Sequence, residues 1–215
     1  MIPLITKQQI AKYVQLSENI DDLDIDSFIR DAQEFDTINV FPIALLDAIA
    51  LQVGNNIAQW NKNATYSAGD KVLFGVYYNS LSTNTNSEPP SADWEDYELM
   101  NFYLQYLQPF IAYSFYYRFI AYLGAKVTPS GLKEVVDETM QIVSDKRRGE
   151  MLGDIKNKVN IWTGKISKKL SDVDYTFDGV RYAPEDGKRI KQGVRIYALG
   201  GHSPKKCFND FNRYE

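Results

Sequence analysis

One stretch of the sequence constrains the fold more than any other, because residues 101–123 hold ten aromatic side chains and leave no polar face. Helical spacing puts half of these rings on one stripe and half off it. The rings on the stripe are Tyr103, Tyr106, Phe110, Tyr113 and Tyr117, and those off it are Phe102, Phe115, Tyr116, Phe119 and Tyr122. A helix that is apolar all round is buried on more than one side. We therefore expect a central helix, kinked at Pro109, that is covered by its own core and by a neighbouring subunit.

The most apolar part of this stretch, residues 109–124, is not expected to span a membrane. It contains Arg118, Ser114 and four tyrosines, and it is too short for a hydrocarbon core of about 30 Å. The N-terminal residues lack a charged region followed by a long apolar run, so no secretion signal is expected. The sequence therefore predicts no membrane partner.

Two shorter helices are expected before the aromatic segment. Apolar residues at three- and four-residue spacing follow an aspartate cluster at 21–26 and predict a helix from Ser27 onward. Pro42 suits the first turn of a second helix, because its missing amide donor is not needed there. This second helix is expected to end near Gly54.

A long basic helix is expected after the aromatic segment. Beyond a turn at 128–131, apolar spacing predicts a helix over 135–143 and a longer helix over 152–170. The other face of this region is cationic, and its side chains could face DNA, partner carboxylates or solvent. The candidate DNA-channel or partner contacts are Arg147, Arg148, Lys156, Lys158 and Lys165.

The texture of the sequence changes between residues 59 and 96, where helical periodicity gives way to short alternating runs and turns rich in Gly and Asn. Residues 66–78 predict two short strands around a turn, and residues 82–91 predict a polar loop. We expect a small all-β insertion at 59–96 within a helical core formed by residues 1–58 and 97–172.

The last part of the chain, residues 173–215, loses the helical pattern. Strand-forming residues such as Val180, Val194 and Ile196 are separated by a polar turn. A weakly packed tail of this kind often becomes ordered only on a neighbouring chain. We expect an extended C-terminal arm with β-hairpin character. Its candidate inter-subunit contacts are Tyr182, Arg189, Arg195 and Tyr197.

The net charge of −4 conceals two halves of opposite sign. Residues 1–100 carry 5 basic and 15 acidic side chains, whereas residues 101–215 carry 19 basic and 13 acidic ones. Such asymmetry is typical of a nucleic-acid-binding tail, of copies that dock acidic face to basic face around a ring, or of ordinary solvated surfaces.

No catalytic motif is present. The single histidine, His202, and the single cysteine, Cys207, exclude a Cys/His structural zinc site within one chain. There is no Gly-rich phosphate loop followed by Lys, no nucleophile elbow and no zinc-protease motif. The aspartate cluster lacks the glycine and the terminal Glu of an EF-hand, so helix capping explains it. We expect no enzyme activity, no cofactor and no metal.

The order of segments carries a first resemblance. These segments are the leader 2–7, the acidic linker, the helix running into residues 40–47, the aromatic helix, the turn at 127–132 and the long Lys-rich helix. This layout resembles the head-tail connector (adaptor, or neck) proteins of tailed bacteriophages, particularly those of Bacteroidetes phages. In that family, small helical subunits form a ring, commonly of twelve copies, beneath the portal. The ring extends the channel for genome ejection, and no catalytic residue is implied.

The β insertion carries a second resemblance. Its pattern runs Trp60, Thr65-Tyr-Ser-Ala-Gly-Asp-Lys-Val72, Tyr77-Tyr78, Pro89-Pro90 and Trp94. It is similar to small chitin-binding-type carbohydrate-binding modules, which stack sugars on exposed aromatic rings, often just after the second strand. This chain has the polar residues 79–84 at that place. The candidate glycan or protein contacts are Trp60, Tyr66, Tyr77, Tyr78 and Trp94.

The sequence thus predicts a mainly α protein with a helical bundle core, a small all-β insertion and an extended C-terminal arm. The leading interpretation is a structural ring component of a phage neck, assembled in the bacterial host cytoplasm and carried in the virion. Its partners would be further copies of itself, the portal protein and other neck or tail proteins, with non-specific passage of DNA. The alternative is a glycan-binding or surface-attachment module on a helical scaffold.

Overall fold

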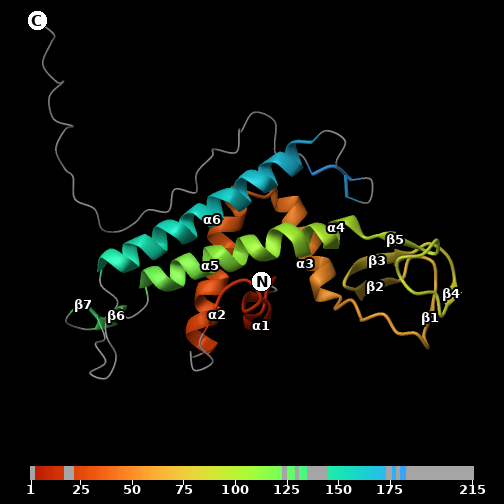
Figure 1. Ribbon diagram of the computed structural model, residues 1–215, viewed down its shortest axis with the longest axis horizontal. Coiled ribbons are helices and arrows are strands. Elements are labelled where there is room, and N and C mark those ends of the chain that lie inside the picture. The colour runs from red at the N-terminus through yellow and green to blue at the C-terminus, as the bar shows by residue number, and fades with distance from the viewer. Residues whose placement is uncertain are drawn as a thin grey trace, which may run out of the picture.

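The computed structural model describes residues 3–16, 22–122, 125–128, 131–134, 145–172, 176–177 and 180–182. They form a helix-rich body with a small β part at one end and a two-stranded hairpin at the other (Figure 1). The helical elements are α1 (Lys7–Ile10), α2 (Asp22–Asp31), η1 (Ala32–Asp36), η2 (Thr37–Asn39), α3 (Ile43–Gly54), α4 (Glu98–Phe102), η3 (Tyr103–Leu107), α5 (Gln108–Tyr122) and α6 (Asp145–Ser171). The strands are β1 (Thr65–Tyr66), β2 (Lys71–Phe74), β3 (Val76–Ser80), β4 (Asn84–Thr85), β5 (Trp94–Asp96), β6 (Ala125–Thr128) and β7 (Gly131–Glu134). The predicted helix-rich class with a small antiparallel β part is confirmed.

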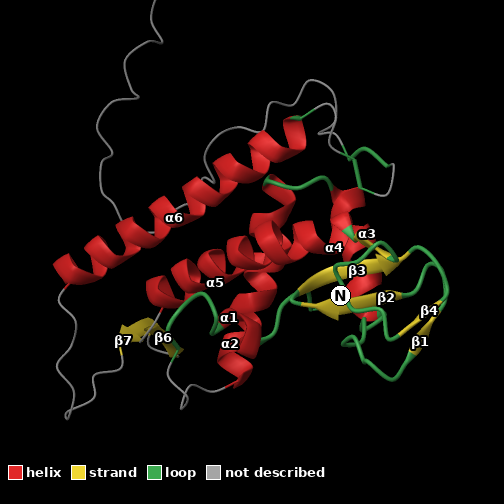
Figure 2. Ribbon diagram, turned by 45° about the vertical axis from the view of Figure 1, so that its right-hand side comes forward, coloured by secondary structure: helices red, strands yellow, loops and turns green. Residues whose placement is uncertain are grey.

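Helix α5 is the centre of the helical body. Helices α1, α2 and α6 all contact it, and α6 runs back alongside it (Figures 1 and 2). Phe110, Ile111 and Phe115 are completely buried, whereas Tyr122 at the C-terminal end of α5 is 49% exposed. Elements of the same chain therefore cover much of the aromatic helix, and the expected contact with a neighbouring subunit stays a prediction.

The helix that contains the aromatic residues is irregular on its N-terminal side. Helices α4, η3 and α5 follow one another without a break, and η3 is a π-helical turn. Pro109 lies just beyond this turn, and a proline cannot donate the backbone hydrogen bond that a regular α-helix needs at that position. The structure thus has a π-helical turn ahead of Pro109 where the sequence predicts a kink.

Helix α2 begins earlier, and helix α3 one residue later, than the sequence pattern indicates. Helix α2 begins at Asp22 rather than at Ser27, so Asp22, Asp24 and Asp26 lie in its first turns, where the helix dipole favours negative charge. Pro42 is the N-cap residue of α3, with φ −59° and ψ 136°, and does not belong to the first turn. Helix α3 ends at Gly54, as predicted.

The β part consists of two small antiparallel sheets. The larger has the strand order β2-β3-β5, and the smaller pairs β1 with β4. Strands β2 and β3 form a hairpin that pairs Phe74 with Val76 around Gly75, whose φ of +72° is the left-handed conformation that glycine tolerates best. A small core of Val72, Tyr78 and Trp94 lies between the strands.

The part of the chain between α5 and α6 contains the hairpin β6–β7, in which Thr128 pairs with Gly131. The helix expected over 135–143 lies outside the described residues. Helix α6 begins at Asp145 and continues to Ser171, so it is longer than the expected 152–170. None of the helices in the described ranges is long and apolar enough to cross a membrane.

The beginning of the expected C-terminal arm packs on its own subunit. Phe177 is 2% exposed and belongs to the main core, where its ring meets Phe102 at a centroid distance of 5.0 Å. A single antiparallel bridge joins Phe177 to Val180. The expectation that the whole segment from residue 173 waits for a neighbouring chain is therefore wrong, because Phe177 fills a place in the core beside α4.

Candidate functional site

The aromatic residues proposed as glycan contacts hold the β part together. The indole nitrogens of Trp60 and Trp94 both donate to the carbonyl oxygen of Ser87, at 3.2 Å and 3.0 Å. The ring of Tyr66 packs edge-on against Trp94, at a centroid distance of 5.2 Å. These three side chains therefore pack against one another and stabilise the interior of the β part.

The two adjacent tyrosines of β3 do not form a sugar platform either. Tyr78 is 8% exposed and belongs to the small core. Tyr77 packs against the helical core, and burial raises the pKa of its hydroxyl above 10.0. Its backbone is held by Asn101, whose amide oxygen accepts from the Tyr77 nitrogen at 2.7 Å. These candidate glycan or protein contacts are thus held within the chain, because the fold places Tyr77 against the helical core and Tyr78 in the small core.

The exposed apolar residues of the molecule are different from the predicted ones. In the β part, Phe74 is 37% and Leu81 is 50% exposed. On α3, Ile43 is 67% and Leu51 is 63% exposed, and their eight-residue spacing puts them on one side of the helix. No sequence motif singles out these positions, although the same spacing rule could have placed Ile43 and Leu51 on one face.

The predicted basic residues lie on α6. Lys156, Lys158 and Lys165 have exposed side chains, as does Arg147. Between residues 155 and 171 the helix carries five lysines and no acidic residue. This half of α6 is therefore a strongly positive surface along the helical body.

Two of these lysines lie over aromatic rings. The Lys158 ammonium nitrogen is 5.3 Å from the ring centroid of Tyr113, and that of Lys165 is 4.3 Å from the ring centroid of Trp162. A cation over an aromatic face is attracted by the negative charge of the ring face. The first contact directs the Lys158 ammonium group toward α5, whereas the second joins two side chains of α6.

Arg148 has a structural role instead of the predicted one. Its guanidinium donates to the carbonyl oxygen of Ile120 at 3.0 Å and 3.2 Å and to that of Ala121 at 2.7 Å. These carbonyls belong to the last turn of α5, which has no partners within its own helix. Arg148 therefore caps α5, and this role removes it from the candidate DNA contacts.

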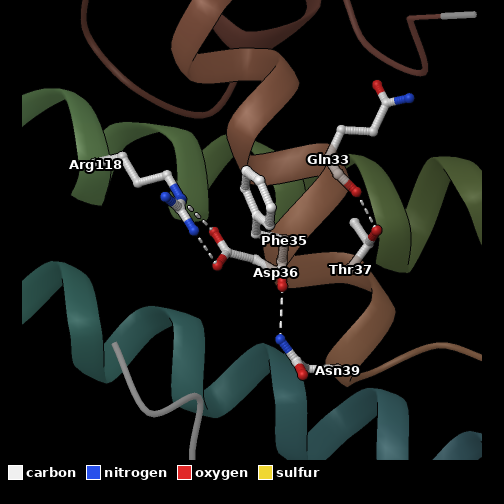
Figure 3. A network of polar contacts seen from close by, with 6 residues as sticks. All are labelled: Gln33, Phe35, Asp36, Thr37, Asn39 and Arg118. Atoms are coloured by element: carbon white, nitrogen blue, oxygen red, sulfur yellow. Dashed lines mark hydrogen bonds and ion pairs between the residues drawn. The ribbon is translucent and has the colours of Figure 1, made fainter. Parts of the chain in front are cut away.

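A buried charge pair joins η1 to α5 (Figure 3). Arg118 donates to both carboxylate oxygens of Asp36, at 2.7 Å and 2.8 Å. The side chain of Asp36 is 5% exposed and that of Arg118 is 22% exposed. The hydrogen bond to Asp36 raises the pKa of Arg118 above its ordinary value.

A second polar contact holds the N-terminal leader near this pair. The Leu4 nitrogen donates to the side-chain oxygen of Gln33 at 2.8 Å, and the Tyr103 hydroxyl donates to the Leu4 carbonyl oxygen. Gln33 also accepts at its backbone carbonyl from the Thr37 hydroxyl, as Figure 3 shows. These contacts, together with the Asp36 pair, are structural, since they tie elements of one chain to each other.

The candidate arm residues are placed only in part. The Tyr182 ring lies edge-on to Phe177 at a centroid distance of 5.6 Å, so it contacts its own subunit. Arg189, Arg195 and Tyr197 lie outside the described residues. In the described ranges, no group of three or more His, Cys, Asp or Glu side chains could hold a metal ion.

The helix-rich fold and the basic helix can be compared with known proteins. A family model described as a family of unknown function (DUF6712) matches residues 70–189, and the chain belongs to this family. The match begins at the start of β2 and includes β3, β5, the aromatic helix and the basic helix. Neither the curated proteins nor the solved structures contain a match.

Proposed function

We propose that the protein is a structural ring component of a tailed-phage neck, which joins the portal to the tail and extends the DNA channel. In this proposal it has no catalytic role and needs no cofactor. It assembles in the bacterial host cytoplasm, becomes part of the virion, and contacts further copies of itself, the portal protein and other neck or tail proteins.

The observation that carries the proposal is the basic half of α6, which packs along α5. Residues 155–171 carry positive charge only, and α6 packs along α5, which is buried by its own chain. A ring of such subunits would present a positive surface to DNA phosphates, which bind without sequence preference.

Two further observations support contacts between copies. The halves of the chain have opposite net charge, which suits a heterologous contact repeated around a ring. Helix α3 leaves Ile43 and Leu51 exposed on one side, and exposed apolar side chains that share a face favour a protein partner. The segment beyond Tyr182, with Arg189, Arg195 and Tyr197, remains the proposed inter-subunit arm.

Electron microscopy of the purified full chain, alone and mixed with its portal protein, tests this proposal. A closed ring of copies, on its own or seated on the portal, is the expected result. A chain that stays monomeric at high concentration, leaves portal unbound and is absent from virions would contradict it.

DNA binding offers an independent test of the α6 surface. We expect the protein to bind duplex DNA at low ionic strength and to lose affinity steeply as salt rises, because phosphate contacts release counterions. Undetectable binding at low salt would mean that these lysines face protein carboxylates or solvent.

A further inference from the structure

One side of the basic half of α6 carries three of its five lysines and one aromatic ring. Lys158, Trp162, Lys165 and Lys169 follow one another at four-, three- and four-residue spacing, and residues at this spacing share one face of a helix. From Lys158 to Lys169 this face extends for about 16 Å at 1.5 Å per residue.

The neighbouring helix contributes rings at matching places. Tyr106 of η3 meets the ring of Trp162 edge-on at a centroid distance of 6.4 Å. Tyr113 of α5 lies beneath the ammonium group of Lys158. We call this surface the seam, and its residues are Tyr106, Tyr113, Lys158, Trp162, Lys165 and Lys169.

A pocket opens at one end of the seam. Its volume is about 540 Å³, which lies within the range of small-ligand sites. Tyr106 and Trp162 line it with rings, Lys165 and Lys168 add positive charge, and Gln105 adds an amide. Lys169 and Asp172 also line the pocket, so its lining carries three lysines and one carboxylate.

Rings and cations that alternate along one line match a ligand that alternates flat groups and negative charges. Single-stranded nucleic acid has this structure, and proteins that bind it combine a positive groove with aromatic rings on which bases stack. A duplex does not fit as well, because its base faces are stacked inside the helix. An acidic peptide needs only lysines, so it does not explain the aromatic rings.

We propose that the seam binds single-stranded nucleic acid. One unpaired base occupies the pocket beside Tyr106 and Trp162, and backbone phosphates contact Lys165 and Lys158. This site does not depend on ring assembly, because its residues come from one subunit.

Fluorescence titration of the full chain with oligothymidylate tests the proposal. Trp60 and Trp94 lie inside the β part, so quenching that disappears in Trp162→Phe reports on the seam. We expect binding at low salt with quenching of Trp162. The double variant Lys158→Glu, Lys165→Glu should weaken binding at least about tenfold, since it reverses two phosphate contacts.

The matched control is the double variant Lys146→Glu, Lys156→Glu. It makes the same change of charge at exposed positions of the same helix outside the seam, and we expect a loss of at most about threefold. Equal losses in the two double variants would overturn the proposal, because the attraction would then be general.

Two other ligands complete the experiment. A blunt duplex of the same length should bind without quenching Trp162, and a duplex that quenches Trp162 as strongly as the single strand would contradict base stacking. Poly-glutamate should compete weakly. If poly-glutamate quenches Trp162 and displaces oligothymidylate at equal charge concentration, the seam is a site for an acidic protein segment and the proposal fails. Absence of any oligothymidylate binding at low salt would also overturn it.

Discussion

Asp36 shows how a single buried charge ties the N-terminal segment to the central helix. Its carboxylate lies at the end of η1 and accepts two hydrogen bonds from Arg118 on α5. A buried ion pair stabilises a fold little compared with apolar packing, but removal of one partner leaves the other charge buried without compensation. The pair therefore matters most for the position of η1 on α5.

Arg118→Ala is expected to lower the free energy of unfolding by about 3 kcal/mol, the low end for a buried pair, because the Arg118 side chain is partly exposed. Urea denaturation followed by circular dichroism measures the change. Arg30→Ala, at an exposed position on α2, is the control and should stay within about 0.5 kcal/mol of the wild type. Similar losses in both variants would show that the Asp36 contact has no special weight.

Tyr103 provides a prediction for alkaline pH. The side chain is 2% exposed, and burial raises the pKa of its hydroxyl from 10.0 to about 12. The folded state thus favours the neutral form, so the contribution of Tyr103 to stability is fully present below pH 10 and is lost as pH rises toward 12. The expected slope from this residue is about 1.4 kcal/mol per pH unit.

The comparison uses Tyr103→Phe, which cannot ionise. At pH 8 the variant should be less stable by about 1 kcal/mol, because the hydrogen bond to the Leu4 carbonyl is lost. Between pH 10 and pH 12 the wild type should lose stability more steeply than the variant, so that the difference between them shrinks or reverses. If the free energies of unfolding of the two proteins change in parallel with pH, the raised pKa of Tyr103 is contradicted.

At the scale of elements, the helical body depends on segments that lie far apart in the sequence. Helix α6 and Phe177 return to the aromatic helix after the β6–β7 hairpin. The part of the chain after α6 is therefore divided, since its beginning completes the core and only the remainder is available as an arm.

Phe177→Ala tests this division. Removal of a completely buried phenylalanine ring costs about 3 kcal/mol or more, because it leaves a cavity against Phe102. Val180→Ala, at a position that is 51% exposed, is the matched control and should cost less than about 0.5 kcal/mol. Denaturant unfolding of both full-length variants measures the effect. If Phe177→Ala is as stable as Val180→Ala, the tail does not contribute to the core.

Replacement of residues 61–93 by a short Gly/Ser linker tests the β part as an element. Trp60 and Trp94 donate to the same carbonyl, but the Trp60 backbone lies beside β2 whereas Trp94 belongs to β5, at the other edge of the β2-β3-β5 sheet. The linker therefore has to span three strands at about 4.8 Å each. The variant loses the hydrogen bonds that Lys71 and Tyr77 make with Tyr97 and Asn101. We expect a folded helical body with its stability lower by about 2 kcal/mol. Loss of cooperative melting in circular dichroism would show that the insertion is part of the main folding unit.

At the scale of the whole molecule, charge and apolar exposure make opposite predictions about assembly. Contacts between the acidic and basic halves weaken with salt, because exposed charges are screened beyond about 10 Å at 0.1 M salt. Apolar contacts through Ile43 and Leu51 would not weaken in this way.

We expect ring assembly to decrease as salt rises from about 0.05 M to 0.5 M, the range over which the screening length falls below the size of a contact. Sedimentation velocity at fixed protein concentration measures it. The distribution of species could instead stay the same or shift to larger assemblies at high salt. Either result would show that the copies contact each other through the apolar side of α3 and not through the oppositely charged halves.

The sequence by itself determined the helix-rich class, the position of the β part and the face of α6 that carries lysines. These features depend on local periodicity, since residues 101–123 can be buried only as a helix in contact with other elements, and the Gly- and Asn-rich turns near Gly75 interrupt that periodicity.

Only the tertiary structure decided which candidate side chains bind or pack within their own chain. Arg148 caps α5, Tyr77 packs against the helical core, and Phe177 belongs to the helical body. Each of these assignments depends on a partner more than twenty residues away in the chain, and periodicity carries no information about such distant partners. The seam has the same origin, because Tyr106 and Trp162 form one pocket only when α6 folds back along α5.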